Sequence, residues 1–194
     1  MILYVYDNYK GNNEAFLSTA HLIILALKQY HKEIGKEFIT DVTMMPEILR
    51  TQKGKPYLEN LPVHFSVSHS ENLWVCLIND TENGVDIQSR NHRNYEAIAH
   101  RFYQPEEQIA VRNGGLPAFI SIWCRKEAFI KYHGLTIGET IDWLNVAQEG
   151  APAEQIEYCG HTIVFSDIDV HPNFLCVAAT STKDKIWIRE IITD

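Results

Sequence analysis

The segment WCRKEAFIKYHG, residues 123–134, constrains the fold more strongly than any other part of the chain. It is rich in good helix formers, and Gly134 stands where helices commonly end in a left-handed residue. At about 100° per residue, the apolar side chains of residues 119–130 form one broad arc on the helix surface. The sequence therefore predicts a helix over residues 116–133 that buries this arc.

Charged residues stand where this helix should be buried. Lys126 and Glu127 fall inside the apolar arc, and Lys131 lies at its edge. Glu127 and Lys131 have the i, i+4 spacing of a surface ion pair, which would explain them if they lay on the polar face. Because an unpaired buried charge is costly, we expect these residues to face an opposite charge, a metal ion or an anionic ligand.

The overall charge narrows the classes of partner. The chain of 194 residues has a formal net charge of −8, which argues against broad binding to nucleic acid or to anionic membranes. Its start lacks the basic region of a signal peptide, and no apolar run approaches the length of a membrane span, so we expect a cytoplasmic protein. The cysteines form no CxxC pair and lie in apolar surroundings, which predicts reduced thiols in the core. They are Cys76, Cys124, Cys159 and Cys176.

Similar patterns recur in the two halves of the chain. A helix is expected over 14–32 and again over 116–133, with strand-like runs at 1–7, 63–68, 73–78, 84–88, 162–167, 174–179 and 185–192. The segment at 63–77 also aligns without gaps to 163–177, with Phe65 matching Phe165 and Cys76 matching Cys176. We therefore expect an α+β fold of two similar halves, residues 1–91 and 92–194, packed together with a ligand cleft between them.

Two strand motifs carry polar side chains that allow more than one interpretation. In NGVDIQSR (83–90), Asp86 and Gln88 alternate with apolar residues, as on the solvated face of an edge strand. FSVSHSEN (65–72) has serines at alternate positions, and Ser68 and His69 stand at the strand end. This suits an ordinary polar turn or a loop that holds a phosphate group. No G-x-S-x-G elbow surrounds the serines, so a Ser–His nucleophile is disfavoured.

A third motif, KGKPY (53–57), is either a turn before a strand or a basic loop against a phosphate or a purine. Taken together, the motifs contain carboxylates for a hard cation, lysines for phosphate and a Ser/His segment for a second phosphate. These residue types suit magnesium-assisted chemistry on a phosphorylated nucleotide.

The order and spacing of these motifs resemble the 4′-phosphopantetheinyl transferases of the Sfp type, in which one chain forms a pseudo-dimer. The matching motifs are GKP (54–56), FSVSHS (65–70), GVDIQ (84–88), RFYQPEE (101–107) and WCRKEAFIKYHG (123–134). The resemblance implies a pseudo-twofold arrangement of the two halves and Mg²⁺-dependent transfer of the 4′-phosphopantetheine group. The donor would be coenzyme A, the acceptor a serine of an acyl or peptidyl carrier protein, and the second product adenosine 3′,5′-bisphosphate.

The resemblance also implies roles at the pyrophosphate. Asp86, Gln88 and Glu127 would bind Mg²⁺, and Glu127 would take the proton of the incoming serine. Lys131 would neutralise the pyrophosphate and assist the leaving group. Many relatives carry GxDxE where this chain has Gln88, so we expect weaker metal binding here, because the site loses one negative charge.

Other residues are assigned to the nucleotide by the same resemblance. Ser68 and His69 would contact the 3′-phosphate, and Gly54, Lys55 and Pro56 would form the loop beside the adenine. Lys126 would be either a phosphate contact or a structural ion pair. Basic residues near the N-terminus could also reach the 3′-phosphate, and the choice among them stays open: Lys28, Lys32, Lys36 and Arg50.

The segment 92–117 is where the resemblance implies that the carrier protein docks. Candidate contacts are Arg93, Arg101, Phe102, Tyr103 and Arg112, although core packing is the favoured interpretation of the two aromatic residues. By analogy, the pseudo-dimer form suggests secondary metabolism and a monomer. Two alternatives stay open: a coenzyme A-binding module without catalytic activity, and a magnesium-dependent nucleotide hydrolase.

Overall fold

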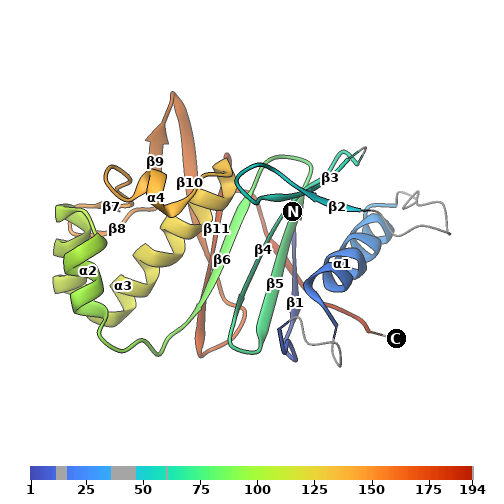
Figure 1. The fold of residues 1–194 in the computed structure, drawn as a ribbon, viewed down its shortest axis with the longest axis horizontal. Coiled ribbons are helices and arrows are strands. Elements are labelled where there is room, and N and C mark those ends of the chain that lie inside the picture. The colour runs from blue at the N-terminus through green and yellow to red at the C-terminus, as the bar shows by residue number, and fades with distance from the viewer. Residues whose placement is uncertain (12–16, 36–46, 60, 194) are drawn as a thin grey trace.

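The computed structural model describes residues 1–11, 17–35, 47–59 and 61–193. In Figure 1, the chain forms layers in which two β-sheets lie between helix α1 (Thr19–Glu33) and helix α3 (Pro105–His133). The N-terminal sheet has the strand order β12–β1–β5–β4, and the C-terminal sheet has the order β6–β11–β10–β9. The expected mixed α+β class is confirmed.

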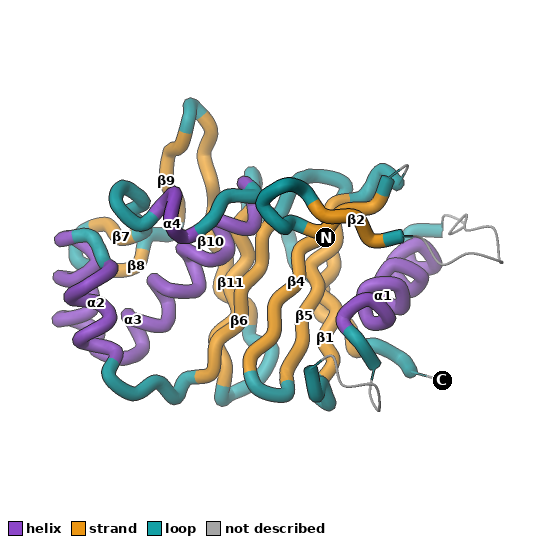
Figure 2. Tube along the Cα trace, viewed as in Figure 1, coloured by secondary structure: helices purple, strands orange, loops and turns teal. Residues whose placement is uncertain are grey.

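The first sheet consists of β1 (Ile2–Tyr6), β4 (His64–Ser70), β5 (Leu73–Asn79) and β12 (Trp187–Glu190). The second consists of β6 (Gly84–Ser89), β9 (Gln155–Tyr158), β10 (His161–Ile168) and β11 (Phe174–Thr180). Two short hairpins pair β2 (Ile48–Arg50) with β3 (Pro56–Leu58), and β7 (Ala147–Gln148) with β8 (Ala151–Pro152). Helices α2 (Tyr95–Phe102) and α4 (Ile137–Thr140) complete the fold, and Figure 2 shows α2 beside the first half of α3.

Strand alternation explains why the sheets are buried on both faces. In β5, Trp74, Cys76 and Ile78 pack toward α1, whereas Leu73, Val75 and Leu77 pack toward the other sheet. A strand covered on both faces reads as a continuous apolar run, and LWVCLIN is one. A third core lies between the second sheet and α3. The core between the sheets takes side chains from both of them, so the sheets are held together by apolar packing.

Helix α3 ends where the sequence predicts but begins at Pro105, before the helix expected over 116–133. Gln104 and Glu107 form a capping box at its start, Pro105 occupies the first turn, and the left-handed Gly134 ends it with φ 61°. Gly115 has φ 61° and ψ −147°, which are not helical values, so the helix is kinked there. The kink lies one residue before the start of the helix expected over 116–133.

Strand pairing bears on the expected division of the chain. Strand β6 pairs antiparallel with β11, Phe174 lying opposite Ser89 and Ala179 opposite Gly84. It therefore belongs to the sheet of the C-terminal half, although it precedes residue 91. A domain boundary at residue 91 remains a prediction. The change from strands of the first sheet to strands of the second occurs before Gly84.

The register also limits the internal sequence match. Phe65 lies opposite Ile78 in the first hairpin, whereas Phe165 lies opposite Ala179 in the second, one residue further along than the ungapped alignment requires. As a result, Cys76 faces the core around α1 and Cys176 faces the core between the sheets. Because a shift of one residue exchanges the two faces of a strand, the match in the second strand of each hairpin is not structural.

The first helix begins later than the sequence predicts. Ser18 caps it, and its hydroxyl accepts a hydrogen bond from the backbone N–H of His21. The expected start at 14–16 lies outside the described residues, as does Lys36. None of the helices in the described ranges is long and apolar enough to cross a membrane.

All four cysteines are free thiols, as expected. Cys76, Cys124 and Cys176 are buried, but Cys159 is exposed in the turn between β9 and β10. The expectation of a core position is therefore wrong for Cys159, because β9 is an edge strand and its turn projects from the sheet.

Candidate active site

The carboxylate of Asp86 is the centre of a buried polar cluster at the junction of the sheets. Asp86 is only 2% exposed and receives hydrogen bonds from three side chains. Ser68 on β4 donates its hydroxyl hydrogen to Oδ1 at 2.7 Å, and Lys131 on α3 donates to the same oxygen at 2.7 Å. Gln88 donates from Nε2 to Oδ2 at 3.0 Å. The structure therefore brings together residues that lie far apart in the chain.

Glu127 on α3 lies close enough to this cluster to be affected by its charges. Burial raises the pKa of Glu127 above its ordinary value, the negative charge of Asp86 raises it further, and the positive charge of Lys131 lowers it. A carboxylate with a raised pKa binds a proton more strongly near neutral pH. Such a group is suited to act as a general base or to compensate a cation.

A glycine allows the helix to approach the strand so closely. A Cβ atom at Gly84 would lie 2.0 Å from the carbonyl oxygen of Ala128 and 2.6 Å from the backbone nitrogen of Tyr132. Only glycine fits this contact between β6 and α3. The contact places Asp86, two residues along β6, opposite Lys131 on the helix.

The Cys124 thiol beside this cluster is buried, which disfavours its reactive thiolate form. Burial raises the pKa of Cys124 well above its ordinary value, and the charge of Asp86 raises it further. Its Sγ lies on the buried face of α3, 3.6 Å from the carbonyl oxygen of Leu175. Because the thiolate is the reactive form, a thiol held protonated in this way is inert.

The GKP loop reaches the C-terminal end of the same helix. Lys55 donates to the carbonyl oxygen of Tyr132 at 2.9 Å and forms an ion pair with Glu82 at 2.5 Å. Gly54 has φ 90°, a left-handed value that the turn requires. Lys55 and Pro56 line a pocket of about 580 Å³. Its other walls combine polar residues of the β2–β3 hairpin with apolar residues of β3 and the start of β4.

His69 points away from the cluster. Its ring lies 4.9 Å from the ring of Tyr9, and it sits on the opposite face of β4 from Ser68 because side chains alternate along a strand. The structure thus separates two residues that the sequence analysis assigned to the same phosphate.

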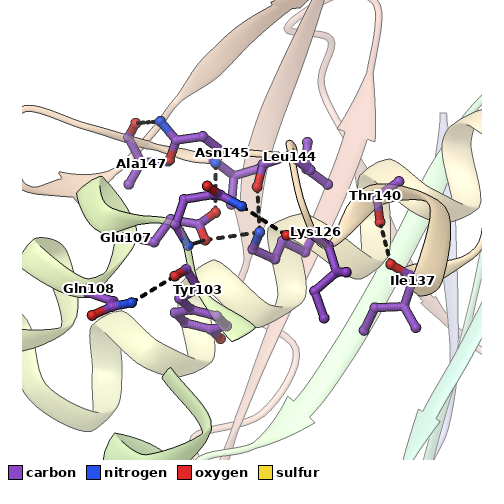
Figure 3. Close-up of polar contacts among 12 residues, drawn as sticks. Tyr103, Glu107, Gln108, Lys126, Ile137, Thr140, Leu144, Asn145 and Ala147 are labelled. Carbon is purple, nitrogen blue, oxygen red and sulfur yellow. Dashed lines mark hydrogen bonds and ion pairs between the residues drawn. The ribbon is translucent and has the colours of Figure 1, made fainter. Parts of the chain in front are cut away.

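The geometry decides between the two roles left open for Lys126. Its ammonium lies 2.9 Å from Glu107 Oε2 and donates to the carbonyl oxygen of Leu144 at 2.5 Å (Figure 3). Glu107 is fully buried and also accepts from the backbone N–H groups of Gln104 and Val146. Lys126 therefore forms a structural ion pair, which was one of its two expected roles, and its ammonium group does not point to a phosphate site. Burial lowers the pKa of Lys126, and the charge of Glu107 opposes this effect.

The donor set around Asp86 fits a magnesium ion that also contacts a phosphorylated substrate. Within the described ranges, no group of three or more His, Cys, Asp or Glu side chains could hold a metal ion. The expected set contains two carboxylates, Asp86 and Glu127, together with the Gln88 amide. Mg²⁺ is commonly held by one or two carboxylates and completed by water and substrate phosphates, which agrees with this small set.

Two residues important for this arrangement were missed by the sequence analysis. Glu107 supplies the partner for Lys126, and its signal was the last acidic residue of RFYQPEE. Gly84 sets the distance between β6 and α3, and its signal was the glycine two residues before Asp86. Both depend on contacts across the fold that a local pattern does not contain.

The structure thus contains a buried carboxylate–lysine cluster and a pocket lined by a basic loop, groups that suit a phosphorylated ligand. Comparison with known proteins agrees with this inference. The profile of the 4′-phosphopantetheinyl transferase superfamily matches residues 82–173, a range that includes Asp86, Glu127 and Lys131. Over this range the chain is similar to the superfamily that its motifs suggested.

Individual relatives show how far the similarity extends. A 4′-phosphopantetheinyl transferase of Bacillus subtilis is 34% identical over 98 residues, which is 48% of this chain and 43% of the relative. A relative from Haemophilus influenzae is 32% identical over 127 residues, 61% of this chain and 50% of the relative. The transferase Sfp of Bacillus subtilis strain 168 is 26% identical over 176 residues, 80% of this chain and 78% of Sfp. The chain thus spans half or less of the first two relatives.

Proposed function

We propose that this protein transfers the 4′-phosphopantetheine group of coenzyme A to a serine of an acyl or peptidyl carrier protein. The observation that carries the proposal is the convergence of Asp86, Glu127 and Lys131 at the contact of β6 with α3, inside the region that matches the superfamily. In the reaction, the serine oxygen forms a new bond to the phosphorus that bears pantetheine. The bond from that phosphorus to the bridging oxygen breaks, and adenosine 3′,5′-bisphosphate leaves.

Each residue of the cluster has a separate role in the proposed reaction. Asp86 and Glu127 would hold Mg²⁺, which when bound offsets the negative charge of the pyrophosphate. Glu127 accepts the serine proton, a role that its raised pKa supports. Lys131 neutralises charge on the leaving group, and Gln88 holds Asp86 through its amide.

The nucleotide would bind between the cluster and the GKP loop. The pocket of about 580 Å³ is large enough for a nucleoside, and Gly54, Lys55 and Pro56 belong to the loop at its edge. Arg50 also lines this pocket, which favours it among the basic residues expected near the 3′-phosphate. His69 remains a predicted contact of the 3′-phosphate.

The carrier protein would dock along α2 and the first half of α3. A groove of about 400 Å³ lies there, and its lining includes Tyr95, Val111 and Arg112. Arg101 stacks over Phe102, which is 36% exposed, whereas Tyr103 is buried. Phe102 therefore remains a candidate contact and Tyr103 belongs to the core.

We further propose that the two sheets and their helices form a pseudo-twofold pair. Strands β1, β5 and β4 with α1 have the same neighbour order as β6, β11 and β10 with α3. The fourth strand differs, because β12 lies beside β1 but β9 lies beside β10. Since one chain supplies both sheets and both helices of this pair, we propose that it acts as a monomer.

Incubation with coenzyme A, Mg²⁺ and a panel of apo carrier proteins tests the proposal. Mass spectrometry should show one phosphopantetheine added per carrier, and the initial rates would identify the preferred carrier class. Binding of coenzyme A without transfer to any carrier would instead indicate a binding module. Release of the bisphosphate without a carrier would indicate a hydrolase.

Glu127→Gln tests the role of the proposed base. The variant should lose about 10²–10⁴-fold in kcat, because the amide cannot take the serine proton. Glu154→Gln, at a side chain that is 86% exposed, is the matched control and should retain the rate. A Glu127→Gln variant with the normal kcat would exclude Glu127 as the base.

A further inference from the structure

Three serines of β4 bind the neighbouring edge strand β6, and one of them differs from the others. Ser66 and Ser70 accept hydrogen bonds from the backbone N–H groups of Val85 and Ser89, each at 3.0 Å. Ser68 accepts from Ile87 at 3.4 Å and also donates its own hydrogen to Asp86 Oδ1 at 2.7 Å. The central serine therefore links the sheet junction to the carboxylate of the site.

The hydrogen bonds on Asp86 leave few acceptor positions. A carboxylate offers about four lone-pair positions, two on each oxygen. Ser68 and Lys131 both donate to Oδ1, and Gln88 donates to Oδ2. Within the described part of the chain, these bonds use three positions and leave one on Oδ2. The rotation of the carboxylate, which Ser68 restrains, decides where that position points.

Ser68 itself is poorly placed to serve a ligand at the same time. It is 8% exposed, and its hydroxyl hydrogen, the only one it can donate, is used by Asp86. A phosphate oxygen needs a donor, so the Ser68 hydroxyl could contact a phosphate only by giving up Asp86. The loss would leave Oδ1 of a buried carboxylate with one donor fewer, which is unfavourable.

We propose that Ser68 is a positioning residue for Asp86 and not a ligand of the 3′-phosphate. Acting from the N-terminal sheet, it orients the carboxylate so that the open position on Oδ2 is directed consistently toward a divalent cation. This inference rests on the proposed function only in taking Asp86 as a metal ligand. Partners that orient a ligand commonly change metal affinity by 10- to 100-fold when they are removed.

Metal binding by Ser68 variants tests the inference directly. Mn²⁺ binding, followed by electron paramagnetic resonance with coenzyme A present and no carrier, should weaken about tenfold in Ser68→Ala. Ser68→Cys keeps the size of the side chain but has a weak donor, and should weaken similarly. Ser68→Thr retains the hydroxyl and should restore most of the affinity. Ser70→Ala, which removes only a bond to β6, is the matched control and should bind Mn²⁺ normally.

A second measurement separates positioning from phosphate contact. The ratio of KM values for 3′-dephospho-coenzyme A and coenzyme A should be the same in Ser68→Ala as in the unaltered protein. A ratio that falls toward one in Ser68→Ala, or unchanged Mn²⁺ affinity in both Ser68→Ala and Ser68→Cys, would overturn the inference. If no carrier is modified by the unaltered protein, the proposed function fails, but the Mn²⁺ measurements still decide the role of Ser68.

Discussion

At the scale of single residues, Asp86 and Gln88 show how neighbouring polar side chains on one strand acquire different roles. Asp86 is buried and receives donors from β4, β6 and α3, whereas Gln88 is half-buried and serves as one of those donors. A glutamate at position 88 would repel Asp86 in the absence of a cation. The amide avoids this repulsion and reduces the negative charge offered to a metal.

Gln88→Glu should therefore strengthen metal binding at this site. The added carboxylate supplies a charge and a ligand, so the Mg²⁺ concentration for half-maximal activity should fall several-fold. Titration of Mg²⁺ against the initial rate measures this concentration. An unchanged half-maximal concentration would show that position 88 has no part in metal binding.

His133 should make the stability of the fold depend on pH. Burial lowers its pKa, as does the charge of Lys55, while Glu82 opposes this effect and His161 adds to it. Its Nε2 atom is buried without a hydrogen-bond partner among the described residues. Because the unfolded chain then binds the proton more strongly, stability should fall as the pH drops below the ordinary histidine value of about 6.5.

Denaturant unfolding at several pH values measures this effect. His133→Phe keeps an aromatic ring in contact with Phe129 and Tyr158. The variant should lose less stability than the unaltered protein as the pH falls from about 6.5 to the lowered pKa of His133 in the folded state. His100→Gln, at an exposed position of α2, controls for the loss of a surface histidine. A pH profile unaltered by His133→Phe would contradict the prediction.

At the scale of elements, the contact of β6 with α3 positions the whole cluster. Gly84→Ala would place a methyl group 2.0 Å from the backbone of Ala128 and force the strand and the helix apart. We expect a loss of about 3 kcal/mol or more in the free energy of unfolding, at the upper end of the range for overpacking. The proposed transfer of phosphopantetheine should be slower as well, because Asp86 and Lys131 would move apart.

Gly138→Ala is the matched control for this substitution. A Cβ atom there meets nothing within 4 Å, and the residue lies in helix α4. The change should be neutral or stabilise the protein by up to about 1 kcal/mol. Thermal unfolding of both variants compares them, and equal stability of the two would show that β6 can shift without cost.

At the scale of the whole molecule, the core between the sheets joins the two halves. It includes Leu3 and Val75 from the first sheet and Ile87 and Phe174 from the second, so neither sheet buries its inner face alone. The serines of β4 add hydrogen bonds to β6 along the same junction. The halves should therefore unfold together.

Tryptophan fluorescence can test this cooperativity. Trp74 is buried between the first sheet and α1, and Trp123 packs beside the core of the second sheet and α3. Two variants would each retain one of these tryptophans and carry Phe at the other tryptophan positions. In each variant, the denaturant midpoint measured by fluorescence should equal the midpoint measured by circular dichroism. A fluorescence midpoint that precedes the loss of circular dichroism in either variant would show that its half unfolds separately.

The sequence by itself determined the main helices and strands and the mixed α+β class, and it predicted Asp86, Glu127 and Lys131 as site residues. These features follow from periodicity, turn residues and motif spacing, which are local properties of the chain. Charges on the apolar arc of α3 predicted partners, and partners are present for Lys126 and Lys131.

Only the tertiary structure decided which partners these are. Lys126 pairs with Glu107, Ser68 binds Asp86 while His69 turns to the other face, and β6 joins the C-terminal sheet. Each of these outcomes depends on contacts between residues distant in the chain, and on which edge of a sheet a strand occupies. Local patterns specify how a segment folds and which face it buries, but the partner of a buried charge is set by the packing of whole elements.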